Sequence, residues 1–272
     1  MKLNKDKRSE AFHPANSHPM TSPFQNHIAL VTGANDPEGL GFGIARELIE
    51  EGATVYFGCR LEAQVEALAE PLASFGPSAR AVQLNVSDPA SITRAFQQIE
   101  SEAGRLDILV NNAGDGANCS ALDETAEQWD RIMTANARGP FLCSQAAARL
   151  MLPRKHGRIV NISSQAASVA IMNHVAYSSS KAALNMLTKS MALEWAPLGI
   201  TVNAVAPTYL MTPGTRPFLE QSEFRQSVLA RIPVGRVGSI HDIAHAVRFL
   251  CHPDSGLITG EVLMVDGGWT LA

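Results

Sequence analysis

The sequence predicts one α/β domain, built on a doubly wound, seven-stranded parallel sheet with helices on both faces. Three observations predict it. Short apolar or β-branched runs alternate with longer helical patterns, no linker or internal repeat divides the chain, and 272 residues suffice for one large α/β layer structure. Strands separated by helices of this length are joined by right-handed crossovers, which give a parallel sheet covered on both faces.

The expected elements follow in chain order. The runs with strand composition lie at 27–32, 54–58, 80–86, 106–110, 157–163, 199–205 and 261–265. Helical patterns lie between them at 42–51, 61–74, 89–103, 126–151, 175–196 and 239–251. Residues 207–238 break the alternation with four prolines and three glycines. Such an excursion is typical of a binding loop, and we expect a substrate lid at about 207–230.

Composition excludes several classes of function. The net charge of −4 argues against nucleic acid as a partner, and no apolar run approaches the roughly 20 residues of a membrane span. Four scattered cysteines favour reduced thiols and a cytoplasmic location. Residues 1–25 are polar with three prolines, so we expect a flexible arm before a domain at 26–272. His241 and His245 lie four apart, but no third ligand is evident, and no metal site is expected.

A glycine-rich turn follows the first strand and leads into a helix. It contains Gly33, Asn35, Gly39, Leu40 and Gly41. Glycines here let the backbone approach a pyrophosphate, and the helix N-terminus supplies free N–H donors and a favourable dipole. After the first strand of a doubly wound sheet, this turn predicts a Rossmann dinucleotide-binding domain.

The end of the second strand bears on which dinucleotide binds. A carboxylate there would bond the ribose hydroxyls and repel a 2′-phosphate, but the strand ends in Gly58, Cys59 and Arg60. A guanidinium suits a phosphate, so NADP(H) is favoured. The negative charge of Glu38 in the turn would weaken phosphate binding, so NAD(H) stays an alternative coenzyme.

The residues with catalytic chemistry lie between 159 and 181. Tyr177 and Lys181 are four apart in a helical stretch and share one face. An ammonium beside a phenol favours the phenolate, which lets the phenol act as an acid or base nearer neutral pH. Ser164 ends the fifth strand, where side chains face the ligand crevice, and its hydroxyl can bond a substrate carbonyl.

With these pieces in order, the chain resembles the main branch of the short-chain dehydrogenase/reductase family over roughly residues 26–272. The matching motifs are the glycine-rich turn, Asn111-Asn112-Ala113-Gly114, Asn136, Ser164, Tyr177-x-x-x-Lys181, Pro207…Thr212 and Val265-Asp266-Gly267-Gly268.

The resemblance implies a role for each matching residue. Tyr177 is the expected general acid in reduction and base in oxidation, Lys181 holds the nicotinamide ribose, and Ser164 polarises the carbonyl. Asn136 anchors a water in a proton relay behind Lys181. The expected coenzyme contacts are Gly33, Asn35, Gly39, Leu40, Gly41, Arg60, Asn85, Val86, Asn112, Ala113, Gly114, Tyr177, Lys181, Pro207, Leu210 and Thr212. Relatives are commonly homotetramers, so the same is expected here.

Three departures separate the chain from the main branch. Five residues lie between Gly33 and Gly39 where three are usual, as in the enoyl-reductase branch. Asn85 replaces a common Asp, and Thr208 stands where Gly normally follows the proline. The enoyl-reductase branch needs Tyr and Lys seven apart, and Leu184 lies seven after Tyr177, so that reading is disfavoured.

The expected activity is hydride transfer between NADP(H) and a ketone or secondary alcohol. A 3-oxoacyl or other small carbonyl substrate is preferred, and a polyol or keto-sugar dehydrogenase using NAD(H) is the alternative. A more remote alternative is a non-catalytic nucleotide-sensing protein on the same fold. Lid residues Tyr209, Met211, Phe218, Leu219 and Phe224 are apolar or aromatic, but they contain no recognisable substrate code.

Overall fold

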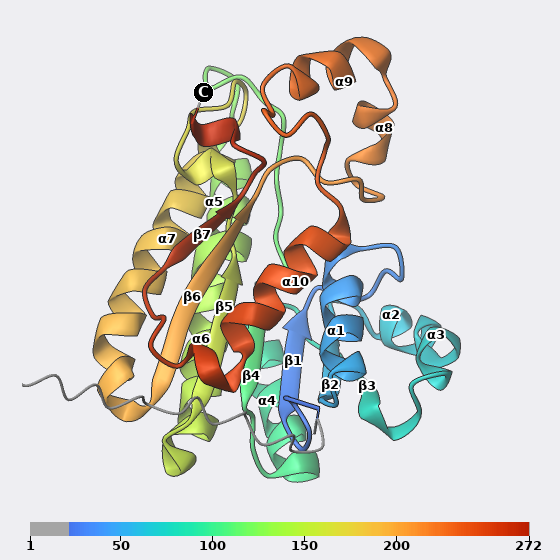
Figure 1. Cartoon of the computed structure of the whole chain (residues 1–272), viewed down its shortest axis with the longest axis vertical. Coiled ribbons are helices and arrows are strands. Elements are labelled where there is room, and N and C mark those ends of the chain that lie inside the picture. Colours follow the sequence, from blue (N-terminus) through green and yellow to red (C-terminus); the bar gives the residue numbers. More distant parts are fainter. Residues whose placement is uncertain (1–21, 272) are drawn as a thin grey trace, which may run out of the picture.

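Seven parallel strands form one twisted sheet through the centre of the computed structural model, which describes residues 22–271 (Figure 1). The strands are β1 (Ile28–Thr32), β2 (Thr54–Cys59), β3 (Ala79–Gln83), β4 (Ile108–Asn111), β5 (Gly157–Ile162), β6 (Ile200–Pro207) and β7 (Val262–Val265). Their order is β3-β2-β1-β4-β5-β6-β7, as expected of a doubly wound sheet. The order reverses between β1 and β4, so a ligand crevice is expected where these two strands end.

The helices are α1 (Leu40–Glu50), α2 (Glu62–Ala67), α3 (Ala69–Ala73), α4 (Pro89–Ala103), α5 (Ala126–Met133), α6 (Gly139–Met151), α7 (Val175–Trp195), α8 (Arg216–Leu219), α9 (Ser222–Leu229) and α10 (Ile240–Cys251). The predicted strands and helical stretches are all present with shifted ends. The largest strand shift is at β3, which ends at Gln83 rather than at 86.

Two predicted helices are interrupted. The stretch 61–74 divides into α2 and α3, because Pro71 has no N–H to bond the carbonyl of Ala67. The stretch 126–151 contains a π-helical turn at Thr134–Arg138 between α5 and α6. Pro140 follows this turn, and it has no N–H to bond the carbonyl of Asn136 four residues earlier. Such turns are frequent at functional sites.

The core lies in two layers, one on each face of the sheet. In Figure 1, α1 and α10 lie in front of the strands, where Phe42, Ile44 and Val247 are buried with the near side of β1 and β2. On the far face α4 and α6 cover the strands, with Phe96 and Ala147 in a second cluster. Helices thus cover both faces, as predicted.

The domain begins before residue 26. Phe24 is fully buried at the C-terminal ends of α1 and α10, where its N–H donates to the carbonyl of Glu51 over 3.0 Å and its ring meets His252. Residues 22–25 of the expected arm therefore belong to the packed domain, and residues 1–21 lie outside the described part of the chain. No helix in that described part is long and apolar enough to cross a membrane.

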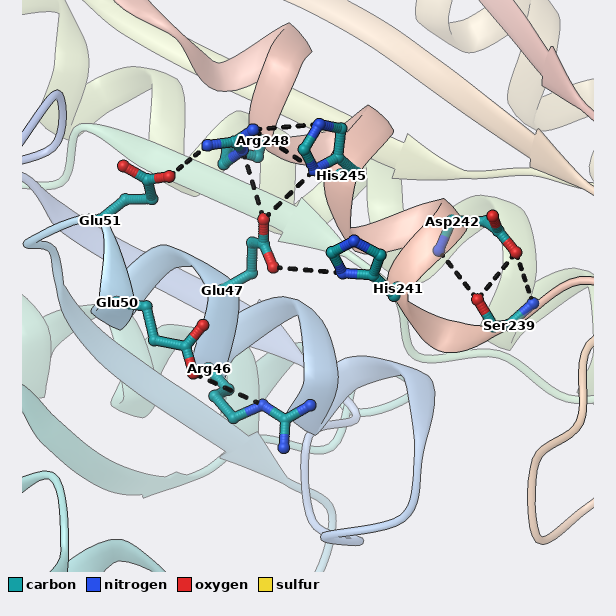
Figure 2. A network of polar contacts seen from close by, with 9 residues as sticks. All are labelled: Arg46, Glu47, Glu50, Glu51, Ser239, His241, Asp242, His245 and Arg248. Carbon is teal, nitrogen blue, oxygen red and sulfur yellow. Dashed lines mark hydrogen bonds and ion pairs between the residues drawn. The ribbon is translucent and has the colours of Figure 1, made fainter.

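A polar network fastens α10 to α1 (Figure 2). The largely buried carboxylate of Glu47 faces His241 at 3.8 Å, His245 at 3.5 Å and the Arg248 Nε at 3.3 Å. Arg248 also pairs with Glu51. The two histidines thus contact a carboxylate and a guanidinium, and residues 22–271 contain no group of three or more His, Cys, Asp or Glu that could hold a metal ion.

Candidate functional site

The glycine-rich turn is packed too closely for side chains at two positions. Gly33 has a φ of +65°, and a Cβ built on it would lie 2.8 Å from the Ala113 Cα. A Cβ on Gly41 would lie 2.4 Å from the Gly33 carbonyl oxygen. Gly39 is the N-cap of α1 and supplies no side-chain cap, so the first N–H groups of this helix stay available to an anion.

Asn112 and Thr32 join the ends of β1 and β4. The Asn112 side chain donates to the carbonyls of Thr32 and Gly33, each over 3.0 Å. The backbone N–H groups of Asn112 and Ala113 donate to the Thr32 hydroxyl over 3.0 and 2.9 Å. Asn112 therefore shapes the turn with its amide. Thr32 was absent from the predicted site, although its place directly before Gly33 at the end of β1 is visible in the sequence.

The predicted adenosine contacts lie beyond the ends of β2 and β3. Arg60 directly follows β2 and is exposed. Asn85 accepts a hydrogen bond from the Ser87 N–H at 3.0 Å through its Oδ1. The amide thus provides the acceptor that the usual Asp would provide, and Val86 beside it is buried.

The structure brings Ser164, Tyr177 and Lys181 together at the carboxyl ends of the strands. Ser164 follows β5, is 9% exposed, and its hydroxyl accepts from the Ala166 N–H over 3.1 Å. Tyr177 lies in the first turn of α7 and Lys181 one turn later. The Lys181 Nζ donates to the Ile162 carbonyl over 2.7 Å and lies 5.7 Å from the centre of the Tyr177 ring.

Burial controls the ionisation of both groups on α7. It raises the pKa of the Tyr177 phenol, although the hydrogen bond with Ser164 lowers it in part and Tyr209 nearby raises it further. Burial also lowers the pKa of the Lys181 ammonium to about 8. The sequence leads us to expect that Lys181 lowers the Tyr177 pKa. Here that pKa is raised, because desolvation of the phenol is the largest effect.

Asn136 lies in the π-helical turn and is fully buried. Its Oδ1 accepts from the Asp115 N–H at 2.7 Å, and its Nδ2 donates to the Asp115 carbonyl at 2.7 Å and to the Ser180 hydroxyl at 2.9 Å. A Cβ on Gly114 would lie 3.0 Å from the Asn136 Oδ1 and 3.6 Å from the Lys181 Nζ. Both Nδ2 protons are thus donated within the protein, and the amide fastens the loop at Asp115 to α7.

The remaining residues predicted to contact the coenzyme lie at the end of β6 and in the segment after it. Pro207 ends β6, and Leu210 is buried. The Thr212 N–H donates to the Thr215 hydroxyl at 3.0 Å, and the two threonine hydroxyls also lie 3.0 Å apart. The Thr208 hydroxyl oxygen is buried without a hydrogen-bond partner among the described residues.

The expected lid contains α8 and α9 and has a small core of its own. Leu219, Val228 and Ile232 are buried there against Trp269. The Tyr209 ring packs on Phe224 and Trp269, with centroids 5.8 and 5.6 Å apart. Most apolar side chains of this segment therefore pack within it, whereas Phe218 is 51% exposed.

Comparison with known proteins gives consistent results. A family model described as enoyl-(acyl carrier protein) reductase matches residues 33–270. The 3-oxoacyl-[acyl-carrier-protein] reductase FabG of Escherichia coli K12 is 39% identical over 245 residues, which cover 90% of this chain and 98% of the relative. The reductase of the same name from Aquifex aeolicus is 38% identical over 250 residues, with 92% and 99% covered.

A solved structure gives a second kind of relative. The gluconate 5-dehydrogenase of Burkholderia cenocepacia J2315, in complex with NADP and tartrate, superposes with a TM-score of 0.88 at 34% identity. The match covers 94% of this chain and all of the other. The relatives thus combine one fold with two substrate classes, a 3-oxoacyl thioester and a sugar acid.

Proposed function

The chain belongs to the short-chain dehydrogenase/reductase family, and we propose that it uses NADPH to reduce a 3-oxoacyl or other small carbonyl compound. Membership makes it an oxidoreductase acting on keto and CH–OH groups. The 3-oxoacyl reductases from two bacteria that match over nearly their whole length support the preferred substrate class.

One observation carries the proposal: Ser164, Tyr177 and Lys181 meet where β5 ends against α7. A carbonyl placed there receives hydrogen bonds from the Ser164 hydroxyl and the Tyr177 phenol. The Ser164 oxygen accepts from the Ala166 N–H, and its own proton, which bonds the Tyr177 phenol, would turn to a carbonyl placed there. Two donors on one oxygen stabilise the negative charge that develops there.

The residues present fit a nicotinamide dinucleotide. The cradle formed by Gly33 and Gly41 admits no Cβ, and the uncapped N-terminus of α1 offers N–H groups to a pyrophosphate. Arg60, exposed directly after β2, would bond a 2′-phosphate, and the solved relative that contains NADP supports this choice of coenzyme. When bound, the nicotinamide supplies the hydride that adds to the carbonyl carbon.

The protein then handles the proton. Because burial raises the pKa of Tyr177, the phenol is protonated at neutral pH and ready to protonate the carbonyl oxygen. The Lys181 ammonium stabilises the phenolate that remains. A proton from solvent would then restore the Tyr177 phenol through Lys181 and a water anchored by Asn136.

A keto-sugar or polyol dehydrogenase is the second candidate, favoured by the gluconate 5-dehydrogenase structure. Enoyl reduction is the description of the matching family model, but Tyr177 and Lys181 four apart fit carbonyl reduction.

The test is NADPH oxidation with a panel that contains a 3-oxoacyl thioester, a β-ketoester, a keto-sugar and an enoyl thioester. Turnover of the first two above the others supports the proposal, and turnover of the keto-sugar alone supports the second candidate. NADPH binding without turnover of any compound, or turnover that survives Tyr177→Phe, contradicts the mechanism.

Two further properties belong to the proposal. Exposed apolar side chains on α7, Met186 and Leu193, support burial between subunits of a homotetramer. All four cysteines are free thiols, which supports a reducing compartment such as the cytoplasm. The tetramer is tested by light scattering of the purified protein.

A further inference from the structure

An ion pair joins the glycine-rich turn to the lid segment. The Arg216 Nη2, on the first residue of α8, lies 2.9 Å from the Glu38 Oε2 in the turn. The two residues are 178 positions apart, so only the fold brings them together. Both side chains are partly exposed, at 45% and 64%, and the pair contributes little to stability. The pair matters because one of its charges, that of Glu38, lies in the glycine-rich turn where the coenzyme is expected.

Glu38 is held beside the expected pyrophosphate site. Its N–H donates to the Asp36 Oδ1 at 3.0 Å, and the Gly39 N–H donates to the Asp36 carbonyl at 2.8 Å. These bonds fix Glu38 directly before Gly39, the N-cap of α1. An anion is attracted to such a helix N-terminus, but an unpaired carboxylate next to it repels the same anion.

Arg216 is held by the turn that follows β6. Its N–H donates to the Thr212 carbonyl over 2.8 Å, within the turn that Thr215 braces through its hydroxyl. This turn carries Thr212, one of the expected coenzyme contacts. The guanidinium therefore reaches from the segment after β6 to the glycine-rich turn, where the pyrophosphate is expected.

We infer that Arg216, a lid residue, sets coenzyme affinity and preference by neutralising Glu38. The inference rests on the proposed use of a nicotinamide coenzyme. Without the guanidinium, the Glu38 carboxylate repels every dinucleotide through its pyrophosphate. It repels NADPH more than NADH, because the 2′-phosphate adds about 1.5 to 2 negative charges.

The experiment measures dissociation constants of NADPH and NADH by fluorescence titration at low salt, without substrate. Arg216→Met should weaken NADPH binding on the order of three- to tenfold, with a smaller loss for NADH. Glu38→Gln should bind NADPH at least as tightly as the wild type. The double variant Glu38→Gln/Arg216→Met should recover most of the loss, and raising the salt concentration should shrink all these differences.

Arg225→Met is the matched control, since Arg225 is an exposed arginine of α9 in the same segment. It should leave both dissociation constants unchanged. If the double variant stays as weak as Arg216→Met, Arg216 binds the coenzyme itself and neutralisation is refuted. Equal affinities in wild type and Arg216→Met refute the inference and leave the proposed function standing. A wild type that binds neither dinucleotide overturns both.

Discussion

Replacing Lys181 by Met tests whether the buried lysine charge lowers the free energy of unfolding of the protein. Lys181 is 5% exposed, and burial lowers its pKa from 10.5 to about 8. The unfolded chain therefore holds the lysine proton more tightly than the folded protein does. The contribution of Lys181 to stability therefore rises with pH between about 8 and 10.5, where the unfolded state holds this proton and the folded state loses it. Met has similar length and no charge to desolvate.

The magnitude follows from the shift. A difference of 10.5 − 8, or about 2.5 units, corresponds to about 3 kcal/mol at neutral pH. The lost hydrogen bond to the Ile162 carbonyl offsets about 1–2 kcal/mol of this, so Lys181→Met should be more stable by about 1–2 kcal/mol at pH 7. This advantage should fall by about 2 kcal/mol on going to pH 9.5, where the folded protein holds Lys181 neutral.

The assay is urea unfolding without coenzyme, at equal protein concentration and at both pH values. Lys189→Met is the control, because it removes an exposed lysine from the same helix and leaves the buried Lys181 in place. A Lys181→Met difference that is the same at both pH values would refute the reasoning, since it would mean that the lysine is not buried in its charged form. Reductase activity should be lost in Lys181→Met whatever its stability.

Four other outcomes are expected. Tyr177→Phe should lower kcat by roughly a hundredfold or more with an unchanged unfolding curve, as loss of a general acid requires. Gly41→Ala should weaken NADPH binding by about tenfold or more, since its Cβ meets the Gly33 carbonyl oxygen at 2.4 Å; titration of NADPH fluorescence measures this. Phe24→Ala should lower the free energy of unfolding in urea by about 3–5 kcal/mol, because Phe24 is fully buried. A change near zero would mean that residues 22–25 do not contribute to the packed domain. Reductive kcat should fall as pH rises through about 8, where Lys181 loses its charge, and a profile flat to pH 10 would contradict that assignment.

The fold was predictable because hydrophobic patterning and glycine placement are local. Each strand is a short apolar run, and the strand order follows from right-handed crossovers. The Gly33 conformation follows from its place between strand and helix, and the structure has it at a φ of +65°. The positions of Ser164, Tyr177 and Lys181 relative to one another required the resemblance to a family as well, because α7 could meet β5 at several registers.

Contacts between distant segments were not predictable. The sequence places Phe24 in a polar arm, because a single aromatic residue among prolines shows no hydrophobic periodicity. In the structure Phe24 is buried in the core cluster that also contains side chains of α10. The ion pair between Glu38 and Arg216 depends on how the segment after β6 packs against the glycine-rich turn. Electrostatic effects were also missed where they depend on burial. Spacing alone suggested that Lys181 lowers the pKa of Tyr177, whereas desolvation raises it.

The π-helical turn at Asn136 is an intermediate case between the predictable local patterns and the unpredictable distant contacts. The sequence contains the residue that causes it, but does not tell which kind of interruption follows. Pro140 within a helical pattern suggests a kink, and its missing N–H removes the partner of one carbonyl, that of residue 136. In the structure the helix continues through a π-helical turn and does not end there. The buried side-chain amide of Asn136 holds this turn by bonds to Asp115 and Ser180. Pro140 therefore removes one α-helical bond at the residue that the proposed proton relay behind Lys181 uses.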